Sequence, residues 1–213
     1  MRVNMTENPN SGNNKKALAF LEKLYANTTI NLVAIDPNSL NVTGITRPVD
    51  DRGIKEFIER HNGSRNIYFM VNMPTDDAPD NKLKKKHVAR IRAVWLDADP
   101  IKGKDFNEER ERLLLFAKDL MKSDRPPTVI IDSGSGIQAF WYLNESVEAT
   151  PENVTLYEAY SRSLSEQYDT DKVHNIDRIM RVPFTWNLPT QKKKDMGRVT
   201  TLSKSTRIGA RYA

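Results

Sequence analysis

The stretch AVWLDADP, residues 93–100, places two aspartates one residue apart at the end of an otherwise apolar run. Because side chains alternate along a β-strand, Asp97 and Asp99 should share one face with Trp95, opposite Leu96. Two carboxylates on one face repel each other, and buried carboxylates rarely lack a partner. The stretch therefore predicts a central strand with positive charge between its two acids.

Divalent cations are the first candidate for that positive charge. Residues two apart on a strand lie roughly 6.5–7 Å from each other, so their carboxylates can lean together around two cations about 3.5–4 Å apart. The chain has no Cys and only 3 His, and oxygen ligands favour Mg²⁺ or Mn²⁺ over zinc. The alternative is a strand end with two solvated aspartates beside Pro100, because an isolated Asp-x-Asp pattern is common.

The surrounding segments predict an α+β fold. Apolar residues recur at helical spacing in four segments: 15–27, 51–62, 105–123 and 150–169. β-rich runs predict five further strands: 30–35, 42–49, 66–73, 128–133 and 137–143. A short helix over 175–183 should stop at Pro183, and a last strand is expected at 198–203. Without regular strand–helix alternation, these hairpin-like strand pairs favour a mixed sheet over a doubly wound parallel one.

The segment 150–169 carries the most complete helix signals. Thr150 is the expected N-cap, since its side chain can accept a hydrogen bond from the first turn. Leu156, Tyr160 and Leu164 recur every four residues and predict an apolar stripe along one side of the helix.

Length and composition fit one large domain. The 213 residues and 38% hydrophobic content support a substantial core, while 29% charged residues indicate a well-solvated surface. No run of about 18 apolar residues predicts a membrane span. Residues 1–14 lack the apolar stretch of a signal peptide and are expected to form a disordered lead. The absence of Cys excludes disulfides and Cys-based zinc sites and is compatible with a cytoplasmic protein.

The net charge of +5 is unevenly distributed. From Asp171 to the end there are ten Lys or Arg against three Asp, a balance of +7, so the preceding 170 residues carry −2. The run KLKKKHVARIR, residues 82–92, adds six basic residues and no acid. Either cluster alone is typical of a solvated surface. Two basic clusters flanking a pair of acids, however, suit a polyanion whose reacting phosphate is held by metal.

A Ser-Gly-Ser-Gly turn joins the two strands of IIDSGSGIQAFWYL, residues 130–143. Such a turn exposes backbone N–H groups and lets a phosphate approach the chain, so Ser133, Gly134 and Gly136 are candidate phosphate contacts. Gln138, just beyond the turn, should point away from the apolar face of the second strand. The alternative is an ordinary hairpin loop. The pattern is neither a P-loop nor a dinucleotide fingerprint, because a strand follows it instead of a helix.

The stretch YDTDKVHNIDRIMRVPFTWNLP, residues 168–189, carries the remaining candidates. A third acid for the site is available at three positions: Asp169, Asp171 and Asp177. Arg178 and Arg181 lie three apart, on one side of the expected short helix, and two guanidiniums together suit bidentate binding of a triphosphate. A surface helix with ordinary ion pairs is the alternative.

Taken in order, these motifs resemble the catalytic core of the archaeo-eukaryotic primase superfamily. The order is Asp-x-Asp on a strand, Ser-Gly-x-Gly with a polar residue on the next strand, a long helix, and then D…R…RxPxTxN. NIYFMVN and TGITRP also look like the N-terminal part of RepB-like primase-polymerase domains of plasmids, phages and integrated elements. The resemblance covers residues 30–200.

This resemblance implies a small RRM-like mixed or antiparallel sheet flanked by helices, packed with an N-terminal α/β unit. The catalytic domain would span residues 15–204, with the α/β unit over 15–90 and the RRM-like unit over 91–204. Residues 205–213 would form a basic tail, or a linker to a further domain.

The resemblance also implies DNA primase and DNA polymerase activity, by template-directed nucleotidyl transfer in the replication of a mobile element or phage. Asp97, Asp99 and Asp171 would be the catalytic acids and would hold two Mg²⁺ or Mn²⁺ ions. Asp171 ranks above the other two candidates because it lies just past the long helix. The expected partners are an NTP or dNTP, a single-stranded DNA template, and a helicase domain or protein.

The nucleotide and template contacts follow by position in the same resemblance. The residues that would bind the nucleotide are Ser133, Gly134, Gly136, Gln138, Arg178 and Arg181. The residues that would contact the nucleic-acid backbone are Lys84, Lys85, Lys86 and Arg90.

Two positions depart from the family pattern. Many members have His where Gln138 stands; Gln cannot carry positive charge, but it can donate a hydrogen bond to phosphate. Phe184 stands where the family usually has Gly. These departures keep open a replication module that binds nucleic acid without catalysis. A rolling-circle nicking protein is disfavoured, because that chemistry needs two His one residue apart and the three His stand at positions 61, 87 and 174.

Overall fold

The computed structural model describes residues 10–206 and 208–212. Its helices are α1 (Ser11–Tyr25), α2 (Arg52–His61), α3 (Phe106–Leu120), α4 (Pro151–Gln167) and α5 (Gln191–Lys194), with a 3-10 turn at Lys85–His87. Its strands are β1 (Thr29–Ile35), β2 (Val42–Pro48), β3 (Asn66–Met70), β4 (Met73–Pro74), β5 (Val88–Ala98), β6 (Val129–Asp132), β7 (Ile137–Glu148), β8 (Ile179–Arg181), β9 (Trp186–Asn187), β10 (Thr201–Leu202) and β11 (Lys204–Ser205). Within the described ranges, no helix has the length and apolar character needed to cross a membrane.

The strands form two larger sheets and one short pair. The four-stranded sheet has the order β2-β1-β3-β8, the five-stranded sheet has the order β11-β6-β7-β5-β4, and β9 pairs with β10. Neighbouring strands are antiparallel throughout. The α+β prediction is therefore confirmed, with antiparallel sheets.

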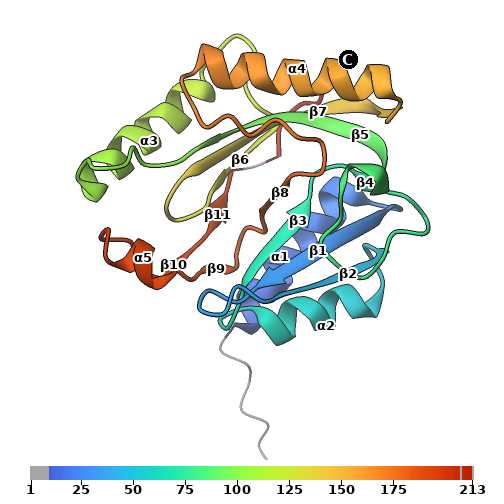
Figure 1. Ribbon diagram of the computed structural model, residues 1–213, viewed down its shortest axis with the longest axis horizontal. Coiled ribbons are helices and arrows are strands. Elements are labelled where there is room, and N and C mark those ends of the chain that lie inside the picture. Colours follow the sequence, from blue (N-terminus) through green and yellow to red (C-terminus); the bar gives the residue numbers. More distant parts are fainter. Residues whose placement is uncertain (1–9, 207, 213) are drawn as a thin grey trace, which may run out of the picture.

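The two larger sheets exchange strands between the halves of the chain. β8 comes from the C-terminal half and completes the N-terminal sheet, while β4 comes from the N-terminal half and pairs with β5. The boundary expected at residue 90 falls within β5. The two units expected from the sequence are thus interlocked around β5 and β8, as Figure 1 shows.

Two cores lie on opposite faces of the five-stranded sheet. On one face, Trp95 and Phe140 join a core that includes α1, α2 and the four-stranded sheet, with the Phe140 ring 6.0 Å from Phe69. On the other face, Leu96 packs under α3 in a second core. Figure 1 shows α4 lying across this second face. The alternation predicted for the central strand is confirmed.

The ends of the chain differ from expectation. Helix α1 begins at Ser11, and Asn14 is buried. Its side-chain oxygen accepts a hydrogen bond from the side-chain amide of Asn62 (2.7 Å). Residues 11–14 are therefore helical, and residues 1–9 lie outside the described residues. Near the other end, the Tyr212 N–H donates to the Tyr142 carbonyl at 2.8 Å. The expected tail thus packs along β7 as far as it is described.

The predicted helix over 175–183 is wrong. This segment is a turn followed by β8, which pairs with β3 in the register Tyr68↔Arg181. Its Ile and Val residues suit a strand, and pairing with a distant strand outweighs the weak helical spacing. Arg178 and Arg181 consequently do not share a helix face.

Helix α4 begins as predicted but presents an unexpected side to the sheet. Thr150 caps it, accepting a hydrogen bond from the Asn153 N–H at 3.3 Å. Of the predicted stripe, Leu164 packs against the second core, but Leu156 and Tyr160 are 44% and 49% exposed, whereas Ser161 is 1% exposed. The Trp95 N–H reaches the Ser161 hydroxyl at 3.4 Å. Small side chains thus let α4 lie close to β5.

Enlarging Ser161 should therefore destabilise the fold more than removing the exposed leucine. We expect Ser161→Leu to lower the free energy of unfolding by about 1–3 kcal/mol, because the larger side chain has no room between α4 and β5. The matched Leu156→Ser should change it by less than about 0.5 kcal/mol. Urea unfolding measures both. The reverse order would contradict this packing.

Candidate active site

Strand β5 delivers its two acids to different environments. Asp97 pairs in register with Gln138 of β7, and its side chain is 15% exposed. Asp99 follows the last residue of the strand, and its side chain is 46% exposed. One acid is therefore buried between the two sheets, and the other opens toward solvent.

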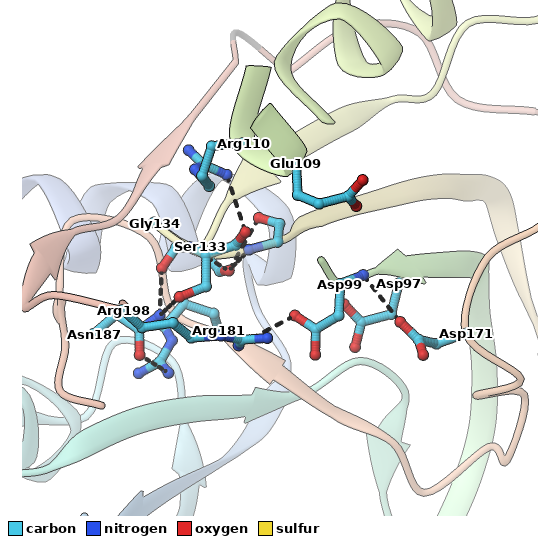
Figure 2. A network of polar contacts seen from close by, with 12 residues as sticks. Asp97, Asp99, Glu109, Arg110, Ser133, Gly134, Asp171, Arg181, Asn187 and Arg198 are labelled. Atoms are coloured by element: carbon cyan, nitrogen blue, oxygen red, sulfur yellow. Dashed lines mark hydrogen bonds and ion pairs between the residues drawn. The ribbon is translucent and has the colours of Figure 1, made fainter. Parts of the chain in front are cut away.

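Asp171 lies directly against this pair. Its N–H donates to the Asp97 carbonyl at 3.0 Å, and its carboxylate accepts from the Asp99 N–H at 2.9 Å. Figure 2 shows the three aspartates together. Of the other two candidates, Asp169 lines the same cavity as Asp99, and Asp177 accepts a hydrogen bond from the Asn175 amide at 2.7 Å.

Burial and like charge act together on Asp97. Burial raises the pKa of its carboxyl, the neighbouring Asp99 raises it further, and together they bring it to about 6. Arg178 opposes this rise, with its guanidinium 3.3 Å from the Asp97 carboxylate. The positive charge of Arg178 therefore does not fully offset the burial of Asp97 and its repulsion by Asp99.

Gln138 connects the two sheets. Its carbonyl oxygen accepts a hydrogen bond from the Arg181 N–H at 3.0 Å, and its NH₂ group lies 3.4 Å from the Asp97 carboxylate. It is buried on the same face as Asp97, as the strand alternation predicts. A neutral amide can donate to one neighbour and accept from the other at this position.

Arg181 is buried away from the open part of the site. Its guanidinium donates to Asn66 (2.8 Å), to Tyr68 (3.1 Å) and to Asn187 (2.9 Å), and it lies over the Tyr68 ring. Among the described residues, no carboxylate forms an ion pair with it. Asn187 in turn donates to the Ser133 carbonyl at 2.7 Å. Arg181 thus supports the Ser-Gly-Ser-Gly turn through Asn187.

The turn itself is tightly bonded. The Gly134 N–H donates to the Asp132 carboxylate (2.8 Å), and the Gly136 N–H donates to the Ser133 hydroxyl (2.9 Å). A Cβ on Gly136 would lie 2.7 Å from the Asp99 carboxylate, so only glycine lets this acid approach the turn. The backbone groups expected to hold phosphate therefore have partners within the turn.

A cavity of about 720 Å³ opens beside Asp99 and Asp171. Several cations line it that the sequence did not single out: Lys102, Arg112, Lys192, Lys193 and Arg198. Arg198 is 7% exposed, and its guanidinium lies 3.7 Å from the Asp99 carboxylate (Figure 2). Burial lowers the pKa of Lys193, and the nearby Asp99 opposes that change. The signal for Lys192, Lys193 and Arg198 was the basic charge of the C-terminal segment, whereas no sequence pattern pointed to Lys102 or Arg112.

The basic segment before β5 lies at the other end of that strand. Lys84, Lys85 and Lys86 are exposed there, and Lys85 forms a 2.6 Å ion pair with Glu158. Arg90 donates to the Ser146 hydroxyl at 2.8 Å. At about 3.3 Å per residue, the length of β5 separates the three lysines from the acids by roughly 30 Å, and Arg90, inside the strand, lies roughly 23 Å along it from Asp97.

The acids fit divalent cations by their chemistry, although they are not gathered into a complete ligand set. Asp97 and Asp99 supply hard oxygen ligands. Because the pKa of Asp97 is raised, a nearby positive charge would stabilise its carboxylate. Within the described ranges, no three acidic or histidine side chains already converge as a metal site. One carboxylate oxygen of Asp171 accepts from the Asp99 N–H, which leaves its other oxygen as the one that could join the pair.

Comparison with known proteins places this site in a recognisable fold. No family model matches the chain, and no curated protein matches it in sequence. Among solved structures, the archaeo-eukaryotic primase (AEP) domain of the cyanophage S-2L primase-polymerase is similar over 93% of this chain and 92% of its own, with a TM-score of 0.61 and 16% identity. The chain has an archaeo-eukaryotic primase-like fold.

Two structures of primase RepB′ share this primase-like fold. One matches 93% of this chain and 58% of its own, with a TM-score of 0.59 and 12% identity. The other, the RepB′ catalytic domain in complex with initiator DNA, matches 94% of this chain and 88% of its own, with a TM-score of 0.55 and 14% identity. The primase-like fold expected from the motifs is thereby confirmed.

Phe184 keeps a glycine-like backbone within this primase-like fold. Its φ is 64°, in the left-handed region, and its N–H donates to the Ser203 carbonyl at 3.1 Å. The ring packs against the main core, which offsets the strain of this conformation. The turn shape typical of glycine is therefore present although glycine is not.

Substitutions at Phe184 should invert the usual order of alanine and glycine. Both Phe184→Ala and Phe184→Gly lose the packing of the ring, but only glycine relieves the left-handed strain. We expect Phe184→Gly to be about 1 kcal/mol more stable than Phe184→Ala in urea unfolding. Equal stabilities, or a more stable alanine variant, would contradict the strained backbone.

The raised pKa of Asp97 predicts a pH-dependent loss of stability. Because the folded-state pKa of about 6 exceeds the ordinary value of 3.8, folding favours the protonated acid, and this stability is lost as pH rises through 6. Without divalent ions, Asp97→Asn should match the wild type near pH 4 and exceed it by about 1–3 kcal/mol near pH 8. Urea unfolding in EDTA measures this difference.

The matched control is Asp119→Asn, at an exposed position on α3. Its difference from the wild type should stay within about 0.5 kcal/mol at both pH values. A variant at Asp97 that is less stable than the wild type near pH 8 would show that the buried carboxylate is satisfied as it stands.

Proposed function

We propose that this chain is a DNA-dependent primase-polymerase that joins nucleotides on a single-stranded DNA template. The observation that carries the proposal is the contact of Asp171 with both Asp97 and Asp99, beside a cavity that Asp99 and Asp171 line together with Lys193 and Arg198. Paired acids facing several cations suit a substrate with a chain of phosphates.

The acids would hold the cations that this reaction needs. Asp97 and Asp99 would bind two Mg²⁺ or Mn²⁺ ions, and Asp171 would join them. The chemistry that two such ions supply is activation of the attacking 3′-hydroxyl and neutralisation of charge on the leaving pyrophosphate. Gln138 and Arg178 would hold the Asp97 carboxylate in place during this reaction.

The cations would bind the triphosphate of an incoming NTP or dNTP. Arg198 lies beside Asp99 and is buried, so its charge is little screened by water, and Lys193 adds a second cation near Asp99 at an exposed position. The Ser-Gly-Ser-Gly turn would act mainly by holding Asp99, because its amides already have partners. This assigns the phosphates to side chains rather than to the turn.

The template would reach the cavity along the exposed cations at its mouth, Lys102 and Lys192. The segment with Lys84, Lys86 and Arg90 would contact DNA farther from the reacting end. Contacts of exposed lysines with phosphates release counterions, so DNA affinity should fall steeply with salt.

A nucleic-acid-binding replication module with the same fold is the second candidate. The observation that favours it is the incomplete gathering of the carboxylates in the described structure. Both candidates bind DNA, but only the first forms phosphodiester bonds.

Primer synthesis on single-stranded DNA separates the two. With Mg²⁺ or Mn²⁺ and mixed NTPs and dNTPs, we expect the wild type to make products and Asp97→Ala/Asp99→Ala to lose at least about a hundredfold in rate. Mn²⁺ should also raise the melting temperature of the wild type but not of this variant. Glu111→Ala/Asp119→Ala, which removes two exposed acids of α3, is the matched control.

The outcomes distinguish the candidates directly. DNA binding without products in the wild type would favour the binding module. Synthesis that survives the loss of both Asp97 and Asp99 would show that the acids of β5 are not the catalytic ones.

A further inference from the structure

A second cavity, of about 410 Å³, lies between α3 and the β11 edge of the five-stranded sheet. These two elements neighbour each other in Figure 1. The residues that form its apolar lining are Leu114, Ala117, Met121, Ile130 and Ile137. We call this cavity the α3 groove. Its volume is in the range of about 300–1,000 Å³ that is typical of ligand sites.

The α3 groove exposes apolar side chains that are not buried in the protein core. Leu113 and Leu120 of α3 are buried against the sheet, whereas Leu114 and Met121 are 41% and 39% exposed. Several large apolar side chains gathered at one exposed place are typical of a surface that binds another molecule.

The rim of the α3 groove is positively charged. Lys118, Lys122 and Lys204 line it, and none of them forms an ion pair with another described residue. The only acid among the described lining residues, Asp132, is held by Arg110 at 3.0 Å. An occupant with negative charge would therefore meet three uncompensated cations.

We propose that the α3 groove binds an acidic peptide segment that carries apolar anchor side chains. The apolar lining would take the anchors, and Lys118, Lys122 and Lys204 would meet the flanking carboxylates. A nucleic acid would share the negative charge, but its bases bind by stacking on aromatic rings. The described lining is aliphatic and offers no ring, so it favours a peptide.

A displayed library of random dodecapeptides, sorted on the full chain, tests this proposal without reference to polymerase activity. We expect the selected peptides to be enriched in Asp and Glu together with Leu, Ile or Phe. A synthetic, fluorescein-labelled copy of one selected peptide should bind in an anisotropy titration, with an affinity that falls as NaCl is added.

Variants locate the peptide on the chain. Lys118→Glu/Lys122→Glu should weaken it at least about tenfold, because two attractions become repulsions. Leu114→Gln/Met121→Gln should weaken it similarly, and both residues are exposed enough for the fold to tolerate the change. The matched control, Lys15→Glu/Lys16→Glu on α1, alters charge equally at exposed positions elsewhere and should bind normally.

Three results would overturn the proposal. The first is selection of peptides without acidic residues. The second is binding that both groove variants leave intact. The third is displacement of the peptide by a single-stranded oligonucleotide whose own affinity drops in Lys118→Glu/Lys122→Glu, which would make the α3 groove a nucleic-acid surface.

Discussion

Burial of a carboxylate beside a second carboxylate is the constraint on which this site depends. Asp97 lies between two sheets, and Asp99 follows just beyond the end of the same strand, so the negative charge of Asp99 disfavours the charge of Asp97. Three neighbouring groups partly offset that repulsion: Arg178 beside Asp97, Arg198 beside Asp99, and the side-chain amide of Gln138 between the sheets. Divalent cations would offset the repulsion more completely. Acids that bind such cations suit phosphate chemistry, because the cations also neutralise charge on phosphates.

The interlocking of the two sheets holds this arrangement in place. β8 crosses from the C-terminal half into the N-terminal sheet, and there the backbone N–H of Arg181 donates to the side-chain oxygen of Gln138. The buried guanidinium of Arg181 then links Asn66 of β3 to Asn187 of β9, and Asn187 holds the turn at Ser133. These hydrogen bonds fix the position of the turn beside the acids, which suits a site that must hold reacting atoms in place.

Several features were predictable because they depend on neighbours in the chain. The strands around β5 and β7 have strong apolar periodicity, and Thr150 caps α4 in the expected way. The helix expected over 175–183 failed because Ile179 and Met180 pair with β3, a strand more than a hundred residues away in the sequence. The stripe of Leu156 and Tyr160 misled for a similar reason: the close approach of α4 to β5 selects the small side of the helix.

Alternation along each strand by itself determined that Asp97 points away from Leu96 and that Gln138 points away from Ala139, since the direction of a side chain in a strand follows from its position. Only the tertiary structure decided that Asp171 lies against both Asp97 and Asp99, and that Arg198 lies beside Asp99 in the lining of the cavity. Those choices rest on contacts between segments far apart in the chain. Such contacts are set by how the sheets and helices pack, which local spacing does not encode.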